Sequence, residues 1–159
     1  MKTTALLALA IGLAGAGATA AENLHVNPAN APISRAVKVP AGSEMLYVSG
    51  ITPRPHNPEA PRDRQTFGDT RTQVASILDQ IAEILRAQGY DWEDVVMMRV
   101  LLVGDPAKGG RMDFEGMMAA YNAVYAPLKT RPARITSQVA GLVAPGMLAE
   151  IEVQAARSR

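Results

Sequence analysis

The residues with the clearest potential for chemistry lie near the end of the chain. Two strand-like runs, residues 133–140 and 147–155, are separated by a segment whose glycines and proline favour a turn. If the runs pair antiparallel, Arg134 at the start of the first lies near Glu150 and Glu152 on the second. Such a cluster of charges is suited to bind and activate a small polar molecule. From spacing alone, a structural salt bridge between Arg134 and one of the glutamates is the simpler interpretation.

The composition excludes several other kinds of site. There is no cysteine, so the chain has no thiol nucleophile, no disulfide and no cysteine-based zinc site. The two histidines, His25 and His56, lie among asparagine and proline residues without the spacing of metal ligands, and we expect no metal. The formal net charge is only +1, and no basic run contains interleaved aromatic residues, so we expect no nucleic-acid partner.

The N-terminus has the pattern of an export signal. Lys2 precedes an apolar run of small residues at positions 5–18, and Ala18, Thr19 and Ala20 form an A-x-A cleavage pattern. The run of about 14 residues is shorter than the roughly 20 that a membrane-spanning helix needs. We therefore expect cleavage after Ala20, a periplasmic or secreted protein, and no membrane association after cleavage. The expected organisation is a signal peptide at residues 1–20, a mobile N-terminal arm at 21–32 and one domain at 33–157.

Hydrophobic periodicity predicts the elements that must position the charged residues. We expect strands at residues 33–39 and 44–49 that form a first hairpin, a helix at 70–88 capped by Asp69 or Gly68, a strand at 94–104, a helix at 114–125 capped by Asp113, and then the two closing strands. The proline-rich segment 52–67 is expected to be an exposed surface loop, with a lid over a site as the alternative.

This order of elements predicts an α+β fold, with two helices on one face of a mixed, mostly antiparallel sheet. The strand at 94–104 is apolar almost throughout, which is typical of a strand covered on both faces. Two helices cover only one face of such a sheet. We therefore expect the chain to associate with other copies through the face that the helices leave bare.

Taken together, these segments resemble the RidA/YjgF/YER057c (Rid) family of small imine deaminases and related proteins. The resemblance spans about residues 32–157, and its last segment is the most specific. The segments are YVSG at 47–50, TQVASILDQIAEILRAQG at 72–89, DWEDVVMMRVLLVGD at 91–105, MDFEGMMAAYNAVY at 112–125 and RPARITSQVAGLVAPGMLAEIEVQAA at 131–156.

The resemblance implies a chorismate-mutase-like (RidA-like) fold and a homotrimer whose sheets form an inner barrel, with sites in the clefts between subunits. It implies that Arg134, in the P-A-R motif, holds the carboxylate of a small-molecule substrate, and that Glu150, in the E-I-E motif, positions the attacking water. The implied reaction hydrolyses 2-imino or 2-enamino acids to 2-oxo acids and ammonia, with no metal or organic cofactor. The P-A-R match favours this role of Arg134 over a structural salt bridge.

The expected pocket departs from that of the deaminases at three positions. Ala36 stands where they carry a tyrosine, Met118 where they carry an asparagine, and Thr136 where they carry a cysteine. We assign Thr136 and Ser49 to substrate binding, although Ser49 is equally suited to be a turn residue at the end of its strand. The altered lining leaves two alternatives to a deaminase. One is a non-catalytic small-molecule-binding or chaperone-like trimer, and the other is a different periplasmic hydrolase that uses the same cleft.

Overall fold

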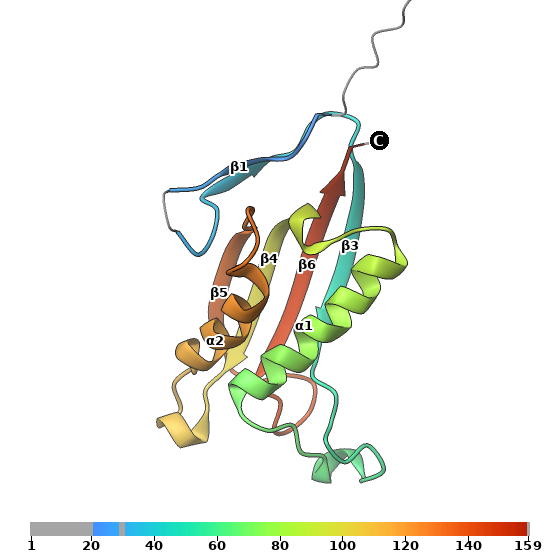
Figure 1. Cartoon of the computed structure of the whole chain (residues 1–159). Coiled ribbons are helices and arrows are strands. Elements are labelled where there is room, and N and C mark those ends of the chain that lie inside the picture. The colour runs from blue at the N-terminus through green and yellow to red at the C-terminus, as the bar shows by residue number, and fades with distance from the viewer. Residues whose placement is uncertain (1–20, 29–30, 159) are drawn as a thin grey trace, which may run out of the picture.

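A computed structural model of the chain describes residues 21–28 and 31–158. The signal peptide expected at residues 1–20 lies outside the described residues. The main sheet contains β3 (Glu44–Ile51), β6 (Ala149–Arg157), β4 (Val95–Val103) and β5 (Ala133–Val139), in that order. Two α-helices, α1 (Thr70–Ala87) and α2 (Phe114–Tyr125), cover the same face of this sheet (Figure 1). The predicted α+β fold, with two helices on one face, is confirmed.

The pairing of the last two strands differs from the prediction. β6 lies between β3 and β4 and is antiparallel to both, whereas β5 is parallel to β4. The predicted closing hairpin is therefore wrong, because β4 lies between β5 and β6. The apolar β4 forms a ladder along each of its edges, and the connection at residues 140–148 crosses to the far side of β4 instead of turning back. The sheet is mixed and mostly antiparallel, as expected.

The N-terminal part of the domain forms a separate two-stranded sheet. β1 (Leu24–Val26) pairs antiparallel with β2 (Ala36–Lys38), so the segment predicted to be a mobile arm contains a strand. The predicted hairpin between residues 33–39 and 44–49 is wrong, because β3 pairs instead with β6. β2 ends at Lys38, and Pro40 two residues later has no backbone N–H to donate to a continuing ladder.

Both predicted helix caps are confirmed. The Asp69 carboxylate accepts a hydrogen bond from the backbone N–H of Thr72 (2.8 Å), and Asp113 caps α2 through Gly116. Gly89 follows α1 with a φ of 77°, a conformation that favours glycine. In the part of the chain that the structure describes, no helix combines the length and the apolar composition needed to cross a membrane.

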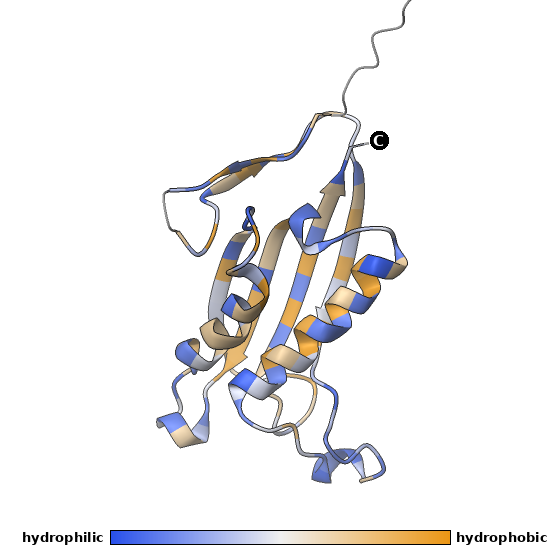
Figure 2. Ribbon diagram, viewed as in Figure 1, coloured by the Kyte–Doolittle hydropathy of each residue, from blue (hydrophilic) through white to orange (hydrophobic). Residues whose placement is uncertain are grey.

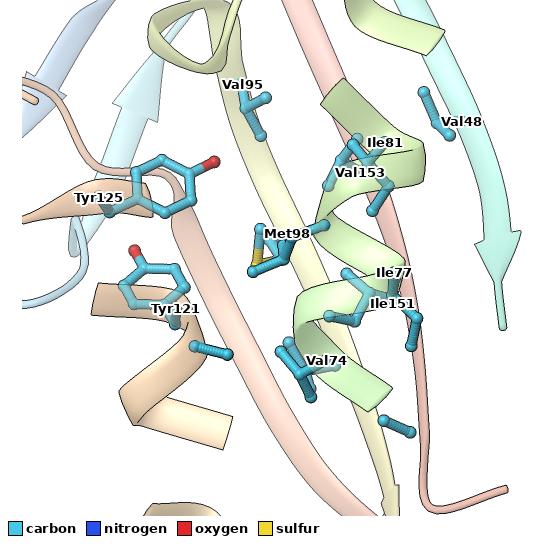
Figure 3. Packing of buried hydrophobic residues seen from close by; sticks show 14 of the residues in the cluster. Val48, Val74, Ile77, Ile81, Val95, Met98, Tyr121, Tyr125, Ile151 and Val153 are labelled. Carbon is cyan, nitrogen blue, oxygen red and sulfur yellow. The ribbon is translucent and has the colours of Figure 1, made fainter. Parts of the chain in front are cut away.

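The hydrophobic core lies between the helices and the sheet. Ile77 and Ile81 of α1 pack toward Ile151 and Val153 of β6, and Met98 of β4 lies between the two helices (Figure 3). Hydrophilic and hydrophobic residues alternate along β6, and α1 carries a hydrophobic stripe on the side that faces the sheet (Figure 2). This alternation assigns each residue of β6 to the core or to the opposite face.

The opposite face of the sheet is not covered by any described element. Exposed apolar side chains on it include Tyr47 of β3 and Ile135 of β5, which are 69% and 49% exposed. Leu101 of β4 and the carboxylates of Glu150 and Glu152 belong to the same face by strand alternation. The expectation of a bare sheet face is met within the described residues, while association through this open face stays a prediction.

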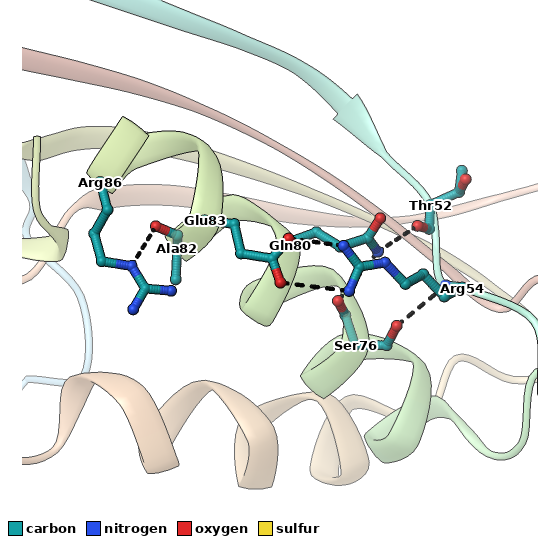
Figure 4. A network of polar contacts seen from close by, with 7 residues as sticks. All are labelled: Thr52, Arg54, Ser76, Gln80, Ala82, Glu83 and Arg86. Atoms are coloured by element: carbon teal, nitrogen blue, oxygen red, sulfur yellow. Dashed lines mark hydrogen bonds and ion pairs between the residues drawn. The ribbon is translucent and has the colours of Figure 1, made fainter. Parts of the chain in front are cut away.

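The proline-rich segment 52–67 is held against α1. Arg54 forms an ion pair with Glu83 (2.7 Å), its backbone N–H donates to Ser76, and Gln80 donates to the carbonyl of Thr52 (Figure 4). A short 3-10 helix, Arg62–Arg64, interrupts the segment. The charged pair is exposed, which agrees with a surface loop.

Candidate functional site

Arg134 is the second residue of β5, and its side chain extends beneath α2. Its Cζ lies 4.4 Å from the centroid of the Tyr121 ring and 6.0 Å from that of Phe114. Its Nη2 lies 3.2 Å from the sulfur of Met118, and its Nη1 lies 4.0 Å from that of Met117. Two aromatic rings and two thioethers therefore surround the half-buried guanidinium.

The charge of Arg134 has no carboxylate partner within the described residues. The ion pairs found there are Arg54 with Glu83, Arg99 with Glu152, and Lys108 with Asp113. A structural salt bridge between Arg134 and Glu150 or Glu152 is therefore wrong for the single chain. Burial lowers the pKa of Arg134 below its usual value, but an arginine remains charged near neutral pH. A partly desolvated guanidinium without a counter-ion is a suitable site for an anion.

Thr136 and Tyr121 complete the surroundings of Arg134. Thr136 lies two residues further along β5, on the same face, and its Oγ1 is buried without a hydrogen-bond partner among the described residues. The hydroxyl of Tyr121 donates to the carbonyl of Pro32 (2.9 Å), and burial raises the pKa of Tyr121 to about 12. Tyr121 therefore stays neutral and acts as a flat support beneath the guanidinium.

Sequence reasoning missed the part that α2 plays in this site. The rings of Tyr121 and Phe114 lie near Arg134, and the sequence motifs assign neither of them to the site. The available signal was the spacing of Phe114, Met117, Met118 and Tyr121, which follows i, i+3, i+4 and i+7 and places them on one helix face. That face meets Arg134 because α2 lies over the edge of the sheet that β5 forms (Figure 1).

Glu150 lies on β6 and belongs to the open face. Its carboxylate rests against the backbone of Gly50, where a side-chain Cβ would overlap a carboxylate oxygen of Glu150. Gly50 and Ser49 fall within an irregularity of β3, where the pairing with β6 shifts between Val48 and Ile51. Ser49 is exposed at this bulge. The absence of a side chain at Gly50 thus leaves room for the Glu150 carboxylate. Ser49 directly precedes Gly50 in the sequence.

Arg134 and Glu150 do not meet within one chain. Arg134 of β5 pairs with Met98 of β4, and Glu150 of β6 pairs with Leu101 of β4. Because these two positions of β4 are three residues apart, Arg134 and Glu150 lie about 10 Å apart along the strand direction. β4 separates their two strands, and their side chains belong to opposite faces of the sheet. The expectation that both charges lie at the same end of one hairpin is wrong. A site that uses both residues requires a second copy of the chain.

Neither residue lines the cavity of about 490 Å³ that lies between residues 21–25 and the end of β6. No group of three or more histidine, aspartate or glutamate side chains suited to hold a metal ion occurs among the described residues. The residues of the sequence-predicted site thus form two half-sites on the two faces of the sheet, one around Arg134 and one around Glu150.

Comparisons with known proteins agree in pointing to one family. The family model described as endoribonuclease L-PSP matches residues 24–157. A RutC family protein from Sulfurisphaera tokodaii is 35% identical over 114 residues, which cover 70% of this chain and 77% of that protein.

Solved structures similar to this chain extend the agreement to the fold. YyfB from Yersinia pestis, described as a protein of unknown function of the conserved Rid family, has a TM-score of 0.63 and 26% identity, covering 84% of this chain and 97% of its own. E. coli TdcF, solved with bound serine, has a TM-score of 0.57 and 29% identity, and the match covers 76% of this chain and 85% of TdcF.

Proposed function

The chain belongs to the RidA/YjgF/YER057c (Rid) family, since the endoribonuclease L-PSP family model matches most of it. On this premise we propose that it hydrolyses 2-imino and 2-enamino acids. One observation carries the proposal: Arg134 is a half-buried cation without a carboxylate partner in the described residues. In the proposed complex its guanidinium holds the carboxylate of the substrate through paired N–H donors. Glu150 orients the water that attacks the imine carbon.

The proposed reaction needs little beyond these two groups. A protonated imine, R–C(=NH₂⁺)–COO⁻, is already electrophilic. Water adds to its carbon, and Glu150 accepts the proton that the water loses. The resulting carbinolamine receives that proton on nitrogen and expels ammonia, which leaves as ammonium once the hydroxyl proton is transferred and the carbonyl forms. The sum is R–C(=NH₂⁺)–COO⁻ plus water giving R–CO–COO⁻ plus NH₄⁺. Enamino acids enter the same path after they tautomerise to imines.

The positions of the two half-sites support a site shared between copies. Arg134 belongs to the helix-covered face and Glu150 to the open face, so the Glu150 that serves a given Arg134 is proposed to come from a neighbouring subunit. The exposed apolar side chains of the open face are suited to pack against another copy. We propose a homotrimer, in keeping with the family resemblance.

Thr136 and Ser49 are proposed to contact the substrate from the two half-sites. The Thr136 hydroxyl is buried without a partner among the described residues, a state that polar atoms rarely keep, and we assign it a substrate oxygen as partner. Ser49 at the bulge is assigned to the water or to the imine nitrogen. Ala36 lies on β2 and supplies no ring to this pocket.

A second function is a non-catalytic binder of small carboxylates. Apolar groups line the surroundings of Arg134, and no acid or base lies beside it in the described part of the same chain, which suits binding without turnover. A binder would hold 2-oxo acids with the same Arg134 but would not accelerate imine hydrolysis. RNA is a poorer ligand, although the family model is described as an endoribonuclease, because the net charge of +1 provides little attraction to phosphates.

The protein is proposed to act outside the cytoplasm. The support is the signal-like pattern of residues 1–20, with its cleavage motif at Ala18 to Ala20. The mass of the protein recovered from the periplasmic fraction tests this directly. Cleavage after Ala20 is expected, and recovery of the uncleaved chain from the cytoplasm alone would contradict export.

The activity is tested by generating 2-iminopropanoate in situ from L-alanine with an amino-acid oxidase, with catalase present, and trapping the imine with semicarbazide. A deaminase competes with the trap, so purified protein should reduce semicarbazone formation in a dose-dependent way and speed the release of ammonia. Heat-denatured protein is the control. Unchanged trapping at micromolar protein would contradict the proposed function.

A further inference from the structure

The residues that surround Arg134 differ in how far they are open to a ligand. Met117 and Tyr121 are each 1% exposed and form the back of the half-site, whereas Phe114 is 44% exposed and Met118 is half-buried. All four are presented by one face of α2. The surfaces that α2 leaves open to a ligand are therefore a phenyl ring and a thioether.

A carboxylate bound to the guanidinium brings its own substituent close to these two surfaces. Charge-assisted N–H···O bonds hold donor and acceptor about 2.8 Å apart. The Phe114 ring centroid is 6.0 Å from Cζ of Arg134, and the sulfur of Met118 is 3.2 Å from Nη2. The carbon chain next to a bound carboxylate therefore lies within van der Waals reach of Phe114 and Met118.

The phenyl ring of Phe114 and the thioether of Met118 favour one class of ligand. An apolar substituent would exchange water for contact with the ring and the thioether, while a hydroxyl or charged substituent would lose water without gaining a hydrogen-bond partner there. The unpartnered hydroxyl in the same region, that of Thr136, is already assigned to a substrate oxygen.

We infer that the site selects carboxylates with apolar side chains, and that Phe114 and Met118 are the residues that determine this specificity. The corresponding substrates are 2-imino acids derived from apolar amino acids, with little use of those bearing a hydroxyl or a charge. This inference rests on the proposed function, because it names the substrate class of the same site. Its test uses binding of the product class, so that it does not depend on turnover.

Isothermal titration of the purified full chain with four 2-oxo acids measures the selection. The probes are pyruvate, 2-oxobutanoate, 3-hydroxypyruvate and 4-methyl-2-oxopentanoate. Affinity should rise by up to about fourfold for each added carbon of the apolar chain. The pair 2-oxobutanoate and 3-hydroxypyruvate differs only by a methyl in place of a hydroxyl, and 2-oxobutanoate should bind at least about fourfold more tightly. Equal or tighter binding of 3-hydroxypyruvate, or no binding of any of the four, would overturn the inference.

Variants of α2 show whether Met118 makes the selection. Met118→Asn should reduce the preference for 2-oxobutanoate to about twofold or less, and Met118→Leu should keep it, because leucine retains the apolar contact. Ala119→Asn is the matched control, since it places the same side chain at the next, exposed position of the helix. Phe114→Ser provides a second variant at the exposed start of α2 if Met118→Asn fails to fold by circular dichroism. Unchanged preference in a folded Met118→Asn or Phe114→Ser chain would overturn the assignment of that residue.

The two proposals fail in different ways. A chain that binds the apolar 2-oxo acids selectively but does not accelerate imine hydrolysis would contradict the deaminase and retain this inference. A chain that hydrolyses imines but binds the methyl and hydroxyl probes equally would retain the deaminase and contradict this inference.

Discussion

The two faces of the sheet hold their charged side chains in opposite ways. On the helix-covered face, Arg134 is half-buried among rings and thioethers and forms no ion pair among the described residues. On the open face, Glu152 pairs with the exposed Arg99, and Glu150 rests against the backbone of Gly50. One face therefore offers a cation without an anion, and the other offers a carboxylate held at a bulge. The contrast suggests that each chain carries two complementary halves of a site and completes it with another copy.

Removal of the unpaired cation should have the largest effect. Arg134→Ala is expected to lower kcat/KM for 2-iminopropanoate by about 10³-fold, because the substrate carboxylate loses its charged partner in a partly desolvated site. Arg54→Ala is the matched control, since Arg54 forms an exposed ion pair with Glu83 and should change kcat/KM by less than about twofold. Comparable losses in both variants would mean that Arg134 has no special role.

Removal of the carboxylate on the open face should have the next largest effect, and on a different kinetic parameter. Glu150→Gln is expected to lower kcat by about 10²-fold with little change in KM, because the amide can still hold a water but accepts its proton poorly. The ratio of the changes in kcat and KM is the measurement. A rise in KM with kcat unchanged would place Glu150 in substrate binding instead.

The bulge at Gly50 should matter because of its position against Glu150. Gly50→Ala introduces a Cβ that overlaps the carboxylate of Glu150. The resulting displacement of Glu150 is expected to lower kcat by at least about tenfold. Gly141→Ala is the matched control, because apart from its two chain neighbours no atom of the described residues lies within 4 Å of a Cβ placed there. Thermal melts of the two variants check that folding is retained. Full activity in a folded Gly50→Ala chain would show that the position of Glu150 is not critical.

The neighbouring carboxylate on the same strand should have the smallest effect. Glu152 forms a partly exposed ion pair with Arg99 (2.9 Å), and exposed pairs contribute at most about 1 kcal/mol to stability. Glu152→Gln is expected to change kcat by less than about twofold and to shift the free energy of unfolding by less than about 1 kcal/mol. If Glu152→Gln lost as much activity as Glu150→Gln, the roles of the two glutamates would need to be exchanged.

Local features of the fold follow from the sequence, whereas the pairing of distant strands does not. The caps at Asp69 and Asp113 and the whole of α2 depend on residues close in the chain, which is why sequence patterns locate them. The turn-like residues between β5 and β6 suit a tight hairpin and a crossing connection alike. Only the ability of β4 to pair along both edges decides between them, and that is a contact between elements far apart in the sequence.

The two charged residues proposed for the site could be named from the sequence, whereas the α2 side chains around Arg134 and the arrangement of the two charges were missed. Arg134 and Glu150 stand out from their motifs, yet their separation onto opposite faces depends on the insertion of β4. The bare face was predictable because β4 is apolar on both sides while two helices cover only one. The support of Arg134 by Tyr121 required knowing which strand α2 covers, and helix periodicity alone does not supply that.

A mixing experiment tests most directly the claim that two copies build each site. Arg134→Ala and Glu150→Gln chains are purified separately, unfolded and refolded together at equal amounts, and assayed for hydrolysis of 2-iminopropanoate. In a mixed oligomer, roughly a quarter of the sites combine an intact Arg134 from one subunit with an intact Glu150 from its neighbour. The account therefore predicts recovery of about a quarter of wild-type activity. A mixture no more active than its two components, despite mixed oligomers seen by native mass spectrometry, would contradict a site shared between chains.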